Sequence, residues 1–115
     1  MRPAMKVELD LKVTDEAKLK MLTFLGSITD YRATLVLLKG REQGESVDLW
    51  RYSVYTPEAM KAVKTAAAEH GKAPLYSFDG LIVAIPQFHL VYELNGKTLG
   101  LGDGSLVVLD RKRDS

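Results

Sequence analysis

Residues 5–13 alternate between apolar and charged side chains without exception, and this pattern restricts the fold more than any other feature of the chain. The apolar members are Met5, Val7, Leu9, Leu11 and Val13, and the charged members are Lys6, Glu8, Asp10 and Lys12. A period of two is that of a β-strand with one face on the core and the other in water. Such strands are typical of antiparallel sheets. The sequence therefore predicts an antiparallel sheet that begins near the N-terminus.

Two segments combine helical spacing with signals for helix ends. Thr14 can cap a first helix that stops at or near Gly26. Thr56 can cap a second helix, with Pro57 in its first turn and Gly71 at its end. The expected stripes are Ala17, Met21, Leu25 and Ile28 in the first helix and Ala59, Val63, Ala66 and His70 in the second. Both segments are predicted to be α-helices.

The rest of the chain is predicted to be strands and turns. Strands are expected at 30–39, 46–55, 74–78, 81–85, 88–94, 97–101 and 105–109, with a connecting loop at 40–45. Asp79-Gly80, Asn95-Gly96 and Asp103-Gly104 are pairs suited to type I′ hairpin turns. Residues 110–115 are charged and lack apolar anchors, so we expect a frayed tail.

The order of these elements favours an α+β fold with a mainly antiparallel sheet and two helices. The first six follow the β-α-β-β-α-β order of ferredoxin-like domains, and C-terminal β-hairpins follow them. The runs 35–38 and 81–85 are apolar at every position, which indicates strands covered on both faces. Two helices can cover one face, so the hairpins or a second subunit are expected to cover the other.

Composition bounds the class of protein but indicates no partner. The chain has 115 residues and is expected to form one α+β domain over residues 1–115. It contains no cysteine and lacks the apolar stretch of a signal peptide, so we expect a cytoplasmic location. The apolar run 81–86 is too short to cross a membrane. The formal net charge of +1 gives no strong field to attract nucleic acid or an anionic membrane.

His89 and Glu93 are the candidate catalytic residues. On a strand from 88 to 94 they would share one face, where the carboxylate could orient the imidazole for general acid–base chemistry. A histidine on a sheet surface beside a neighbouring charge is the commoner arrangement. His70, near the end of the second helix, suits the negative end of the helix dipole instead.

Trp50, Tyr52 and Arg51 are the candidate ligand-binding residues. Trp50 and Tyr52 would share one face of their strand and could stack on a planar ligand or a base, with Arg51 supplying charge. Ordinary packing or a dimer contact explains the same residues, since tryptophan and tyrosine are enriched at interfaces. The basic residues 111–113 add only a weak electrostatic footprint for nucleic acid.

Two glycine-containing segments resemble nucleotide-binding motifs only superficially. Residues 100–105 lack the last glycine of the dinucleotide fingerprint, because Ser105 stands in its place, and Gly96-Lys97-Thr98 lacks the first glycine of a P-loop. No serine nucleophile motif occurs, and neither histidine has the spacing of a metal site. The sequence therefore predicts no cofactor and no metal.

The sequence does not identify an activity, and three hypotheses remain open. The first is a small soluble binding or interaction module, expected to be a homodimer, with a ligand pocket or an interface for a small molecule or a protein on one sheet face. The second is a small acid–base enzyme that uses His89 and Glu93. The third is a weak single-stranded nucleic-acid binder over Trp50 and Tyr52.

Overall fold

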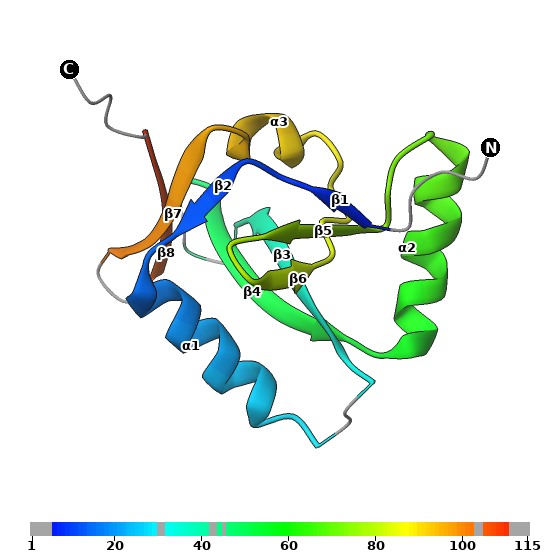
Figure 1. The fold of residues 1–115 in the computed structure, drawn as a ribbon, viewed down its shortest axis with the longest axis horizontal. Helices are drawn as coiled ribbons and strands as arrows, with labels where there is room; N and C mark the ends of the chain where they lie inside the picture. The colour runs from blue at the N-terminus through cyan, green and yellow to red at the C-terminus, as the bar shows by residue number, and fades with distance from the viewer. Residues whose placement is uncertain (1–5, 30–31, 42–43, 45, 103–104, 111–115) are drawn as a thin grey trace.

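The computed structural model describes residues 6–29, 32–41, 44, 46–102 and 105–110. Within them the chain has a mixed α+β fold (Figure 1). The strands are β1 (Lys6–Glu8), β2 (Leu11–Val13), β3 (Thr34–Gly40), β4 (Leu49–Tyr55), β5 (Leu75–Phe78), β6 (Leu81–Val83), β7 (Lys97–Gly102) and β8 (Ser105–Asp110). The helices are α1 (Asp15–Gly26), α2 (Pro57–Glu69) and α3 (Leu90–Leu94). None of these helices is long and apolar enough to span a membrane.

The strands form two sheets that join into a closed circuit. One sheet has the order β1-β5-β6 and the other β2-β7-β8-β4-β3. They meet at a parallel bridge between Val36 and Ala84, where the Leu37 N–H donates to the Ala84 carbonyl at 3.0 Å and the Ala84 N–H donates to the Leu35 carbonyl at 2.9 Å. They meet again where β1 continues into β2. The circuit therefore encloses a barrel-like core.

The predicted N-terminal strand divides at Leu9 and Asp10. β1 pairs in parallel with β5, and β2 pairs in parallel with β7 in the other sheet. The Leu11 N–H donates to the Leu9 carbonyl at 2.9 Å, a local bond that bends the strand between its two partners. The predicted buried face is confirmed at Leu9, Leu11 and Val13, but it is wrong at Val7, which is 39% exposed. The expected antiparallel pairing is wrong for this strand, and Met5 lies outside the described residues.

Both predicted helices are confirmed, but the buried face of the second is wrong: Ala59 and His70 are exposed, and Met60, Val63 and Ala67 are buried. The hydroxyl oxygens of Thr14 and Thr56 accept the backbone N–H groups of Ala17 and Ala59, each at 3.2 Å, as N-caps do. α1 packs on the enclosed core through buried Ala17 and Met21. α2 covers the outer face of the barrel wall, where its Met60 and Val63 contact Val36 and Ala84.

The strand predicted at 88–94 is wrong, because residues 90–94 form α3. Alternation favoured a strand there, but Leu90 and Leu94 are also four residues apart and therefore share a helix face. Both leucines are buried in the main core, while Tyr92, expected on their face, is 72% exposed. Packing of this short helix against the core decides its conformation.

The predicted turns are confirmed in part. Asp79 and Gly80 have φ of 48° and 83° and join β5 to β6, as a type I′ turn requires. Asn95 and Gly96 (φ of −62° and 80°) instead form a bend of type II sign between α3 and β7. Residues 103–104 lie outside the described part, although β7 and β8 pair on either side of them. Asp110 belongs to β8, and the rest of the predicted tail is outside the described residues.

The ferredoxin-like expectation is only partly matched. The first elements follow the predicted order if β1 and β2 count as one strand. β3–β4, β4–β8, β5–β6 and β7–β8 pair in antiparallel fashion, but β1 and β2 pair in parallel and the strands form two sheets. Both faces of the run 35–38 are covered within one chain, by the barrel core on one side and by α2 on the other. A second subunit is therefore not needed to cover this run. The expected coverage of both faces is wrong for the run 81–85, because Ile82 on β6 is 50% exposed.

Candidate functional site

An apolar groove of about 620 Å³ lies along α1, and we call it the α1 groove. Its lining combines one face of the helix with side chains from β4 and β7: Glu16, Leu19, Lys20, Thr23, Phe24, Tyr52 and Leu101. The four helical positions from Glu16 to Thr23 follow the spacing i, i+3, i+4 and i+7, which places them on one face. The groove is therefore a combined surface of a helix and the barrel beneath it.

The base of the α1 groove consists of two aromatic rings. Phe24 on α1 and Tyr52 on β4 meet edge to face, with ring centroids 5.2 Å apart and planes at 74°. Both rings are half-buried and pack against the main core. β4 holds Tyr52 opposite Leu37 of β3, so its position is fixed by the sheet. The base is therefore held in place by packing and strand pairing.

The wall of the α1 groove includes an exposed leucine. Leu19 is 68% exposed, and Leu22, one turn along the helix and outside the groove lining, is 44% exposed. Opposite charges, Glu16 and Lys20, stand at the rim. An exposed apolar patch bordered by polar groups is typical of an interaction surface, because water contact with this surface is unfavourable. The arrangement suits binding of apolar groups.

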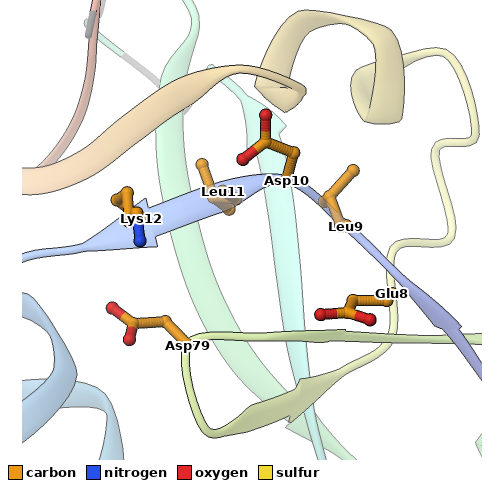
Figure 2. Close-up of a pocket in the computed structure, with 6 residues that line it drawn as sticks. All are labelled: Glu8, Leu9, Asp10, Leu11, Lys12 and Asp79. Atoms are coloured by element: carbon orange, nitrogen blue, oxygen red, sulfur yellow. The ribbon is translucent and has the colours of Figure 1, made fainter. Parts of the chain in front are cut away.

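A second cavity, of about 360 Å³, opens in the barrel wall where the N-terminal strand leaves β5 (Figure 2). It is lined by Glu8, Leu9, Asp10, Leu11, Lys12 and Asp79. The Asp79 carboxylate accepts the Val13 N–H at 3.0 Å and lies 3.7 Å from Lys18 Nζ. The Asp79 side chain thus accepts a backbone N–H of β2 that β5 does not pair with. This role is structural.

The carboxylates around this second cavity do not converge. Figure 2 shows Glu8 and Asp79 on the β5 side of the strand, while the carboxylate of Asp10 points away from Asp79. Across the described part of the chain, no group of three or more histidine, aspartate or glutamate side chains is arranged to hold a metal ion. This cavity therefore gives no argument for a cation site.

Trp50 does not line the α1 groove and is partly buried against the main core. It faces Lys39 across the β3–β4 pair, and Lys39 Nζ lies 5.1 Å from the centre of its ring. The same Nζ forms an ion pair with Glu93 at 2.8 Å. The Gln87 side chain accepts the Lys39 N–H at 2.9 Å and donates to its carbonyl at 3.0 Å. These contacts tie the end of β3 to the segment around α3.

His89 and Glu93 are placed by a helix rather than by a strand. His89 precedes α3 and is exposed, and its side chain makes no capping hydrogen bond. Glu93 is also exposed and its partner is Lys39. Neither residue lines the α1 groove or the wall cavity. The acid–base interpretation of this pair stays a prediction, and the strand geometry on which it was based is absent.

Ionisation is perturbed beside the C-terminal end of α2. The hydrogen bond from Lys72 to Tyr92 lowers the pKa of the Tyr92 phenol and raises the pKa of the Lys72 ammonium. Burial raises the pKa of the nearby Tyr76 phenol. His70 caps α2 as expected, and its ring lies 5.8 Å from that of Phe88. These contacts join α2 to the segment around α3.

The structure separates the three predicted ligand-binding residues. Tyr52 lines the α1 groove, Trp50 packs under Lys39, and Arg51 belongs to the opposite face of β4, as its position in the strand requires. Sequence reasoning missed Leu19, which has the highest exposed fraction of the apolar side chains that line the groove. The signal was present, because Leu19 lies on the helix face opposite the predicted stripe of Ala17 and Met21.

Comparison with known proteins adds no assignment. The chain matches no protein-family model. A search of curated proteins likewise finds no significant relative. Any function proposed for this chain must therefore be argued from its own residues.

Proposed function

We propose that this protein is a small protein-interaction module and that the α1 groove is its contact surface. The observation that carries this proposal is the exposure of Leu19, which is 68% accessible although it borders a groove with an aromatic base. A small ligand in the groove would leave much of this leucine in water. A protein partner can cover the groove and the adjoining Leu22 together.

The composition of the α1 groove fits the anatomy of protein interfaces. Phe24 and Tyr52 form a central aromatic base, and aromatic side chains are enriched among residues that dominate binding energy. Glu16 and Lys20 form a charged rim. Full burial of one leucine side chain is worth about 1.5–3 kcal/mol relative to exposure. Leu19, the most exposed apolar side chain of the groove, is therefore expected to contribute strongly to binding.

Selection from a displayed library of amphipathic helical peptides tests this function. We expect selected peptides to present apolar anchors at helical spacing and to bind the unmodified protein. Binding should be lost in Leu19→Asp and kept in Ile82→Asp, because Ile82 on β6 is 50% exposed but does not line the groove. Selection of no binder, or of binders that do not distinguish the two variants, would contradict the proposed function.

A further inference from the structure

We infer that the partner of the α1 groove is a second copy of this chain, bound through α1 about a two-fold axis. The inference rests on the proposed function and names the partner. The seam consists of Glu16, Leu19, Lys20 and Thr23, which lie on one face of α1 and line the groove. The same patch supplies both a protruding side chain, Leu19, and an apolar surface to receive it. A patch with both parts can bind its own copy, as two-fold contacts require.

The rim charges favour this symmetric pairing. Suppose that the two α1 helices pack antiparallel and that the two-fold axis passes between them at the level of residue 18. Position 16 of one copy then lies opposite position 20 of the other. Each Glu16 then faces the Lys20 of the second copy, and the pair occurs twice. A rim with one sign of charge would repel its own copy, whereas this rim attracts it.

The same axis brings the apolar centres together. Leu19 lies one residue from the axis, so the two leucines are offset by only about 3 Å along the helices, at a rise of about 1.5 Å per residue. Each then lies opposite position 17 of the other copy and can pack against the part of the groove lined by Glu16, Leu19 and Lys20. The formal net charge of +1 means that two copies do not repel each other strongly.

The first experiment measures sedimentation velocity of the full chain from micromolar to millimolar concentration. We expect a reversible monomer–dimer equilibrium. Leu19→Asp should raise the dissociation constant by at least about thirtyfold, the effect of losing one dominant interface side chain. Ile82→Asp should leave it unchanged, and circular dichroism of both variants should show the unmodified helix content. A monomer at every concentration would overturn the inference.

Charge reversal then tests the predicted pairing. Glu16→Lys and Lys20→Glu should each weaken the dimer several-fold, because each places like charges across the axis. An equimolar mixture of these two variants should form a heterodimer about as stable as the original dimer. An ion pair between residues 16 and 20 of the same chain is lost in both variants and is not restored by mixing them. Stronger association of the mixture must therefore come from ion pairs between the two copies.

A mixture of Glu69→Lys and Lys64→Glu is the matched control, since it makes the same changes of net charge on the exposed surface of α2. Each control variant should dimerise like the original protein, with no preference for the mixed dimer. Failure of the Glu16→Lys and Lys20→Glu mixture to associate better than either variant alone would overturn the two-fold model. If the original chain is monomeric but selected peptides still require Leu19, the second copy is excluded and the proposed function stands.

Discussion

Lys72 and Tyr92 show how one contact between elements sets the ionisation of a side chain. Lys72 Nζ donates to the phenolic oxygen at 2.9 Å and lies 5.2 Å from the centre of the same ring. The cation stabilises the charged phenolate, so the pKa of Tyr92 lies below its ordinary value. The contact joins α3 to the residues that follow α2 and is accessible to solvent, which makes it convenient to titrate.

Removing the cation should raise the pKa of Tyr92. We expect the NMR titration of the Tyr92 ring to move to higher pH in Lys72→Met, back towards the ordinary tyrosine value. The pKa of Tyr76, which Lys72 also lowers, should rise further above its ordinary value. Lys64→Met, on the exposed surface of α2, is the control and should move neither titration. An unchanged Tyr92 titration in Lys72→Met would show that this contact does not persist in solution.

At the scale of elements, the helical conformation of α3 can be tested directly by mutation. Leu94 is fully buried and Tyr92 is 72% exposed. Leu94→Ala should lower the free energy of unfolding by about 2–5 kcal/mol, the range for buried leucines. Tyr92→Ala should change it by about 0.5 kcal/mol, as is usual at exposed positions. Denaturant unfolding measures both, and similar costs would instead indicate a strand with both residues on one face.

The elements differ in how far local sequence could predict them. Thr14 and Thr56 are strong local signals, so both long helices were predicted with their caps. α3 has no such cap, and its two buried leucines fit a strand and a helix equally well. The parallel partners of β1 and β2 are β5 and β7, which lie far along the chain. Local periodicity reports which face is buried but not which strand lies alongside.

The same limit applies to the candidate site. Tyr52 could be selected from the sequence because an aromatic residue on a mixed strand suggests a contact. The part played by Leu19 depends on α1 lying beside β4 and β7, and only the three-dimensional arrangement supplies that information. His89 and Glu93 were selected by strand spacing, whereas the helix gives Glu93 a structural partner in Lys39.

At the scale of the whole molecule, the circuit of strands is completed by side chains as well as by backbone pairing. β3 meets the other sheet through the bridge at Ala84. Beyond that bridge the Gln87 side chain hydrogen-bonds both the N–H and the carbonyl of Lys39, as a neighbouring strand would. On the other side of the barrel, Asp79 does the same for the Val13 N–H. Each side chain satisfies backbone groups where two strands diverge, which allows the strands of the described residues to close around the main core.

The contribution of Gln87 to this closure can be measured separately from its packing. Gln87→Met keeps a side chain of similar size but leaves the Lys39 N–H and carbonyl without these partners. We expect it to lower the free energy of unfolding by about 1–3 kcal/mol, the cost of unsatisfied, partly buried polar groups. The amide of residue 39 should exchange with solvent faster relative to that of Leu37, which donates to Ala84.

The control is Lys39→Met, which removes the contacts of the ammonium with Glu93 and Trp50 but keeps the backbone bonds to Gln87. In this variant the amide of residue 39 should stay protected, while the fluorescence of Trp50, the single tryptophan, should change. Equal protection of that amide in Gln87→Met and in the unmodified protein would mean that Gln87 does not maintain the closure. Closure at this point would then depend on the bridge at Ala84, because its two backbone hydrogen bonds are the nearest connection between the sheets.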